Sequence, residues 1–156
     1  MEIRLSSNSR EETMLIGKKV AKHLWVGSVL TLSGDLGAGK TTFTKGVGLG
    51  LGITEPINSP TFNILKCYFN EPLTLYHIDA YRLEDVNPEN KDIGLEEVIE
   101  GDGVCLIEWP MYIEEFIPED VVNVEIYNKG ENDREIIFKT TSDKYNDLFN
   151  FLREYK

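Results

Sequence analysis

The chain has 156 residues, of which 41% are hydrophobic and 28% charged, and we expect them to form one domain over residues 1–156. The formal net charge of −11 argues against strong nucleic-acid binding by the chain alone, so an anionic ligand needs a local site that overcomes the overall field. No membrane-spanning run, secretory signal or metal-binding cysteine spacing occurs, and we therefore expect a cytoplasmic protein in which Cys67 and Cys105 are reduced.

The first predicted element is a helix that begins after Ser9. Ser9 and Glu12 have the spacing of a capping box, and apolar residues then recur at helical intervals. A short buried strand over residues 29–32 follows, and a second helix begins near Lys40. Glycines alternate through its second half, GVGLGLG, and each interior glycine costs roughly 1 kcal/mol relative to alanine. The pattern predicts either close packing or an early end of this helix.

The rest of the chain predicts two antiparallel hairpins, one strand between them and two further helices. The hairpins cover residues 62–81 and 121–141, the strand covers 103–110, and the helices cover 94–101 and 143–155. Strands and helices are thus mixed along the chain, which is typical of an α/β fold. Because two hairpins occur, we expect a three-layer sandwich with a mixed β-sheet.

Residues 34–41 match the phosphate-binding pattern GxxxxGK[ST], directly after a predicted strand and before a predicted helix. In this context the glycine-rich backbone can turn its N–H groups toward phosphates, and the helix N-terminus adds a partial positive charge. We expect Lys40 to reach the β- and γ-phosphates and the Thr41 hydroxyl to bind Mg²⁺. The residues expected to contact a nucleotide are Gly34, Asp35, Leu36, Gly37, Ala38, Gly39, Lys40, Thr41 and Thr42. The fold is therefore predicted to be P-loop NTPase-like.

Two acids stand at the ends of predicted strands, where a phosphate cradle needs a carboxylate for the metal. Glu108 follows the apolar run VCLI, and Asp79 ends the run LYHI. Either acid could bind Mg²⁺ directly while the other orients the attacking water, and the sequence leaves this open. Thr61, in the segment SPTF, is either part of a switch loop that closes on the γ-phosphate or part of a plain turn.

Three further residues have two readings each. His77 shares a strand face with Asp79, so it could hydrogen-bond to that acid or be a satisfied core histidine. Arg82 could sense the γ-phosphate or pair with a nearby acid. Trp109 follows Glu108 and is either part of the nucleotide site or a core aromatic.

Two nucleotide-dependent classes are poorly matched. The segment Asn90-Lys91-Asp92 differs in spacing and position from the guanine-reading motif of GTPases. A small-molecule kinase usually carries an arginine-rich lid, whereas the five arginines here are scattered along the sequence. A regulatory ATPase that acts with partner proteins fits better, and a small-molecule or nucleoside kinase is the alternative.

The motifs GDLGAGKTTF, SPTF, LYHIDAYR and LIEWP occur in an order that resembles the TsaE (YjeE) family, over roughly residues 5 to 118. The resemblance implies a slow ATPase that binds ATP or ADP with Mg²⁺ and supports threonylcarbamoyl modification of adenosine 37 in ANN-decoding tRNAs. It implies the TsaD and TsaB proteins as partners, with tRNA reached only through them.

Residue by residue, the resemblance places Lys40 and Thr41 on the family's phosphate and metal positions and Asp79 and Glu108 on its two acids. Thr61 falls on its switch threonine and Trp109 on its tryptophan. A nucleotide-sensing module with negligible turnover is a third possibility.

Overall fold

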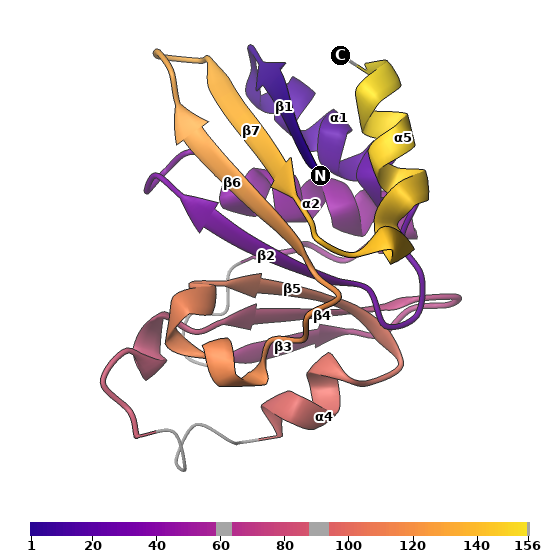
Figure 1. Ribbon diagram of the computed structural model, residues 1–156, viewed down its shortest axis with the longest axis vertical. Helices are drawn as coiled ribbons and strands as arrows, with labels where there is room; N and C mark the ends of the chain where they lie inside the picture. The colour runs from indigo at the N-terminus through magenta and orange to yellow at the C-terminus, as the bar shows by residue number, and fades with distance from the viewer. Residues whose placement is uncertain (59–63, 88–93, 156) are drawn as a thin grey trace.

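The computed structural model describes residues 1–58, 64–87 and 94–155 (Figure 1). The strands are β1 (Glu2–Ser7), β2 (Val29–Gly34), β3 (Leu65–Tyr68), β4 (Thr74–Asp79), β5 (Gly103–Glu108), β6 (Val122–Asn128) and β7 (Arg134–Lys139). The α-helices are α1 (Arg10–Ala21), α2 (Lys40–Leu51), α4 (Leu95–Ile99) and α5 (Asn146–Tyr155). Short 3-10 turns cover Tyr81–Leu83, Pro110–Tyr112, Glu114–Phe116 and Asp143–Tyr145.

The strands form one seven-stranded mixed sheet in the order β1-β7-β6-β2-β5-β4-β3. The four central strands β6, β2, β5 and β4 are parallel, so their carboxyl ends share one edge of the sheet. The outer strands pair antiparallel, β3 with β4 and β7 with both β6 and β1. The predicted hairpins and mixed sheet are confirmed. The edge strand β1 was missed, although its alternating buried residues Ile3, Leu5 and Ser7 carry the strand pattern.

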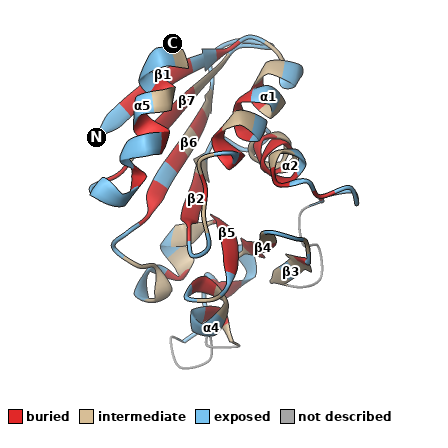
Figure 2. Ribbon diagram, turned by 90° about the vertical axis from the view of Figure 1, so that its right-hand side faces the viewer, coloured by how far each residue is buried: buried red, intermediate tan, exposed pale blue. Residues whose placement is uncertain are grey.

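Helices α1, α2 and α5 pack on one face of the sheet and share one hydrophobic core with it. Among the described residues, the second face has its own core only beside β2, β4 and β5, where α4 and the 3-10 turns after β5 cover it. Figure 1 shows α4 at that end of the molecule, and Figure 2 shows buried residues concentrated in the strands. The three-layer arrangement is therefore complete over only part of the sheet.

Over β1, β6 and β7 the second face carries charged side chains that pair with one another. Lys139 Nζ lies 3.1 Å from Glu125 Oε2, and an Arg4 guanidinium nitrogen lies 3.5 Å from Glu135 Oε1. These ion pairs are partly exposed to solvent, so each contributes on the order of 1 kcal/mol or less. They keep this face polar where none of the described helices covers it.

The alternating glycines of α2 are explained by close packing. A Cβ added at Gly46 would overlap the carbonyl oxygen of Met14, and one at Gly50 would overlap that of Lys18, both in the backbone of α1. Gly48 faces the other way, toward the side chain of Ile57. Two helices can approach this closely only where the contact positions lack side chains. The predicted alternative, an early end, is wrong, since α2 continues to Leu51.

Candidate nucleotide site

The segment GDLGAG forms the turn between β2 and α2, as the motif predicts. Gly34, Gly37 and Gly39 have φ values of 120°, 73° and 108°, which L side chains rarely adopt. Gly39 caps the helix in the left-handed conformation, and no side chain caps the first turn. The helix start therefore presents backbone N–H groups and partial positive charge at the turn, a geometry suited to a bound anion.

The turn is tied to the end of β6. A Cβ on Gly34 would overlap the backbone of Ile126, so only glycine fits there. The Asp35 N–H donates to the Ile126 carbonyl at 3.0 Å, and the Asp35 carboxylate accepts the Asn128 N–H at 2.8 Å. The carboxylate of Asp35 thus braces the turn, while the side chain of Leu36 is 86% exposed. Any contact of these two residues with phosphate would be made by their backbone.

Lys40 begins α2 and folds back over the turn. Its Nζ donates to the carbonyls of Asp35 at 3.2 Å and Gly34 at 3.4 Å, and it lies 5.7 Å from the centroid of the Trp109 ring. Trp109 has φ 58° and is the only non-glycine with positive φ in the described part of the chain. Its ring also packs against Tyr81 and Tyr112. Trp109 therefore lies beside the turn, and its unusual backbone conformation is typical of functional sites.

The two strand-end acids come together at the carboxyl edge of the sheet. Asp79 pairs with Glu108 in the β4–β5 register, and Glu108 pairs with Leu32 on β2, two positions before the turn begins. Both side chains point to the face that carries α1 and α2, since residues of one strand pair share a face. Glu108 is buried, at 5% exposure, and Asp79 is half-buried. The sheet therefore places two carboxylates next to the glycine-rich turn.

His77 pairs with Glu108, and neither of the two predicted readings holds. Its Nε2 lies 2.8 Å from Glu108 Oε2, while Asp79 Oδ1 accepts the Tyr81 N–H at 3.1 Å instead. Asp79 is therefore engaged by the turn that follows β4. His77 is fully buried, and its Nδ1 has no hydrogen-bond partner in the described part of the chain, so it is not a satisfied core histidine either.

Burial raises the pKa of Asp79 above its ordinary value. The hydrogen bond from the Tyr81 backbone N–H opposes this shift, the charge of Glu108 adds to it, and the charge of Arg82 opposes it. The charge of Arg82 thus acts on this acid, while both interpretations of Arg82 stay predictions. The carboxyl edge of the sheet is an environment in which a positive ligand would be favourable.

The donor set fits a Mg²⁺ ion that arrives with a nucleotide. Within residues 1–58, 64–87 and 94–155, no three His, Cys, Asp or Glu side chains gather to hold a metal by themselves. Magnesium in nucleotide sites is usually held by one or two protein oxygens together with phosphate and water oxygens. Thr41 in the first turn of α2 and the carboxylates of Glu108 and Asp79 can provide those protein oxygens.

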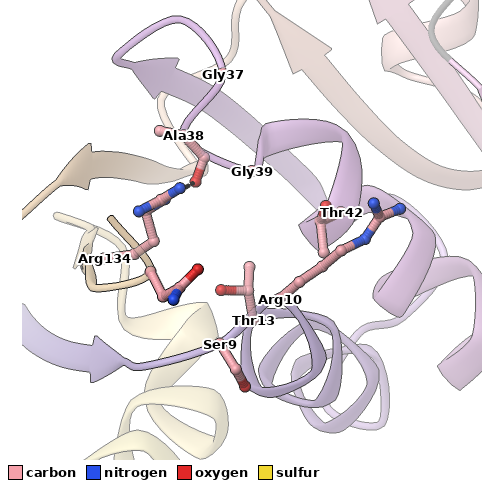
Figure 3. Close-up of a pocket in the computed structure, with 9 residues that line it drawn as sticks. Ser9, Arg10, Thr13, Gly37, Ala38, Gly39, Thr42 and Arg134 are labelled. Carbon is pink, nitrogen blue, oxygen red and sulfur yellow. Dashed lines mark hydrogen bonds between the residues drawn. The ribbon is translucent and has the colours of Figure 1, made fainter. Parts of the chain in front are cut away.

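A cavity of about 200 Å³ adjoins the turn and contains residues that sequence reasoning missed (Figure 3). It lies between the start of α1, the glycine-rich turn and the β6–β7 turn, and Gly37, Ala38, Gly39 and Thr42 line one side. The opposite sides are lined by Ser9, Arg10, Thr13, Asn132 and Arg134. These residues are far apart in sequence, so no local motif could have indicated them.

Arg134 connects two walls of this cavity. Its Nε donates to the Ala38 carbonyl at 3.1 Å, and its NH1 donates to three carbonyls of the β6–β7 turn, those of Gly130, Glu131 and Asp133. Figure 3 shows the side chain reaching toward Ala38. One guanidinium group thus joins the hairpin to the glycine-rich turn.

Several sequence predictions lie outside what the structure describes. Thr61 and the SPTF segment fall within residues 59–63, and the Asn90-Lys91-Asp92 segment falls within residues 88–93. Of the two cysteines, Cys105 is buried, Cys67 is half-buried and both are free thiols. The described helices are too short or too polar to span a bilayer.

Comparison with known proteins identifies relatives along most of the chain. The profile of one family, described as "Threonylcarbamoyl adenosine biosynthesis protein TsaE", matches residues 7–136. A Bacillus subtilis protein named tRNA threonylcarbamoyladenosine biosynthesis protein TsaE is 51% identical over 86% of this chain and 84% of its own. A Treponema pallidum protein of the same name is 44% identical over 86% of this chain and 98% of its own.

A solved structure agrees with the sequence matches. The crystal structure of Bacillus subtilis YdiB superposes with a TM-score of 0.84 at 40% identity, covering 99% of this chain and 96% of that one. The agreement extends over the hairpins and the C-terminal helix as well as the motif-bearing half.

Proposed function

The chain belongs to the TsaE family, and from this premise we propose that it is a slow Mg²⁺-dependent ATPase that supports threonylcarbamoyl modification of adenosine 37 in ANN-decoding tRNAs. The observation that carries the proposal is one edge of the sheet. There the glycine-rich turn and the N-terminus of α2 lie beside the strand-end carboxylates of Glu108 and Asp79. Anion-binding backbone and metal-binding oxygens are the two parts that phosphoryl transfer to water requires.

In the proposed site the backbone from Gly34 to Thr42 holds the phosphates of ATP or ADP. Lys40 leaves its own loop carbonyls and pairs with the β- and γ-phosphates. Thr41 and one of the two acids hold Mg²⁺, which when bound neutralises charge on the phosphate oxygens. The other acid orients the attacking water. Thr61 is proposed to close on the γ-phosphate, and Trp109 to pack beside the nucleotide.

The cavity beside Arg134 favours a ligand that carries a nucleoside over free phosphate as the occupant of the site. It continues from Gly39 and Thr42, where the phosphates would lie, toward Ser9 and Asn132 on other elements. Hydroxyl, amide and guanidinium groups line it, so a ribose or base would find several hydrogen-bonding partners there.

We propose that hydrolysis changes the conformation of this protein and that this change acts on a complex of TsaD and TsaB. The net charge of −11 supports this arrangement, because the chain itself would repel a tRNA backbone that its partners would have to bind. The cytoplasmic location expected from the sequence is part of the same proposal.

The chemical proposal is tested with γ-labelled ATP and the purified chain. We expect label to appear in inorganic phosphate, slowly alone and faster with TsaD and TsaB. Lys40→Ala should nearly abolish ADP binding measured by calorimetry, with Lys45→Ala on the same helix as a control that binds normally. Label on an organic acceptor would make the protein a kinase, and phosphate release at background with partners present would make it a nucleotide sensor.

The role in the pathway is tested by multiple-turnover modification of tRNA with TsaD, TsaB and the other required components. We expect modified tRNA to accumulate beyond one turnover only with this chain and ATP. Equal accumulation without the chain would contradict the proposed role.

A further inference from the structure

The His77–Glu108 pair is unusual because both side chains are removed from water at the edge of a candidate catalytic site. His77 is 0% exposed and Glu108 is 5% exposed, and their nitrogen and oxygen lie 2.8 Å apart. His77 lies opposite Leu106 in the β4–β5 register, so it reaches Glu108 diagonally, while Asp79 lies directly opposite that acid. The histidine therefore approaches Glu108 from the interior side of the sheet edge.

The two nitrogens of His77 have different surroundings, and this determines where the proton lies. Nε2 faces a carboxylate oxygen, which accepts hydrogen bonds, whereas Nδ1 is buried and has no partner among the described residues. A proton on Nδ1 would leave a buried N–H unsatisfied, and buried N–H groups without acceptors are rarer than unused acceptors. The arrangement that fits has a proton on Nε2, donated to Glu108.

From this geometry we infer that His77 is a positioning residue for Glu108. The Nε2–H bond occupies Oε2 from the interior, which fixes the orientation of the carboxylate and leaves Oε1 for the metal or water. The bond also supplies the donor that an ionised carboxylate needs when it is buried. This inference rests on the proposed function for the identity of the step that Glu108 serves, but the hydrogen bond itself can be tested without any turnover.

The first test reads the tautomer directly. Nitrogen-15 NMR of the full chain without nucleotide, near neutral pH, should show His77 Nε2 protonated and Nδ1 bare. A shift of the Nε2 resonance in Glu108→Gln, with His23 in the same spectrum as the unaffected control, would support the contact. A proton on Nδ1, or a His77 signal unchanged by Glu108→Gln, would overturn the inference whether or not the protein hydrolyses ATP.

The second test separates positioning from general structural support. His77→Leu removes the donor, and His77→Gln keeps an N–H at a similar distance from the backbone. Loss of a residue that orients a catalytic ligand costs roughly 10- to 100-fold. We expect a loss of this size in kcat for His77→Leu and a substantial recovery of kcat in His77→Gln. In both variants the affinity for ADP without Mg²⁺ should change by less than about twofold.

A double-mutant cycle measures whether His77 and Glu108 affect the rate through each other. If His77 acts only through Glu108, adding His77→Leu to Glu108→Ala should lower kcat by no more than about threefold, because the alanine has already removed the acceptor of the hydrogen bond. Losses that multiply fully would overturn the inference, as would a wild-type rate in His77→Leu. If wild-type protein shows no hydrolysis, the proposed function fails, and the NMR result alone decides whether His77 holds Glu108.

Discussion

The glycine-rich turn and the strand-end acids lie on the same edge of the sheet but owe their geometry to different parts of the chain. The turn is one continuous segment whose glycines adopt positive φ and whose helix follows at once. Asp79 and Glu108 come from two strands that reach the turn only because β4, β5 and β2 pair side by side. Local backbone geometry forms one half of the site, and long-range pairing forms the other.

The two halves also differ in their contact with water. Residues 34–37 are exposed, whereas Glu108 and His77 are buried. Exposed backbone donors need no partner before a ligand arrives, because water satisfies them, but a buried carboxylate does. In the proposed function the turn therefore determines affinity and the acids determine rate, and variants should separate the two effects.

The largest expected effect is on the rate. Glu108→Gln keeps the size of the side chain but removes its charge, so ATP hydrolysis should fall on the order of 10²- to 10³-fold. ADP affinity without Mg²⁺ should stay within about twofold, since the carboxylate is not part of the turn. Steady-state phosphate release and calorimetry measure the two quantities. A variant with reduced affinity and a normal rate would reverse the assignment of the two halves.

The next largest effect is on stability and concerns the packing of α2, the helix that follows the glycine-rich turn, against α1. Gly46→Ala should lower the free energy of unfolding by about 1–3 kcal/mol, because the new methyl group would meet the Met14 carbonyl in α1. Gly48→Ala is the matched control on the same helix, since its methyl group would meet only the end of the Ile57 side chain, which can move. Urea denaturation of both variants measures the difference. Equal stabilities would show that α1 and α2 tolerate separation.

A smaller effect should appear in affinity. Arg134→Met removes the hydrogen bond to Ala38 and the three bonds to the β6–β7 turn while keeping much of the side-chain volume. With that side of the turn released, we expect ADP to bind about tenfold more weakly. Arg153→Met, on α5, is the control and should bind ADP normally. If both variants bind equally well, the hairpin does not support the turn.

The smallest effect concerns the charge of Asp79. Its pKa is raised in the fold above the ordinary value of 3.8, so its ionisation lowers stability as the pH rises through and beyond that value. Asp79→Asn keeps the acceptor for the Tyr81 N–H and removes the charge. It should raise the free energy of unfolding at pH 7 by less than about 1 kcal/mol, because the half-buried group is partly solvated. The gain should disappear near pH 3, and denaturation at both values tests this.

The sequence by itself predicted the α/β class, both hairpins, the turn and helix of the glycine-rich motif, and the two acids at strand ends. These features depend on local patterns: hydrophobic periodicity, glycine spacing and the position of a polar residue after an apolar run. The edge strand β1 was missed although its alternation spans six residues, because its partner β7 lies far along the chain and no hairpin turn joins the two. The roles of Thr41, Lys40 and the acids in catalysis remain predictions.

Only the tertiary structure decided which distant groups meet. It showed that Gly46 and Gly50 of α2 pack against the backbone of α1, and that His77 pairs with Glu108 and not Asp79. It also showed that Arg10 and Arg134, two of the scattered arginines, line one cavity. The physical reason is that such contacts depend on strand order and helix packing. The spacing of residues along the chain does not encode these directly.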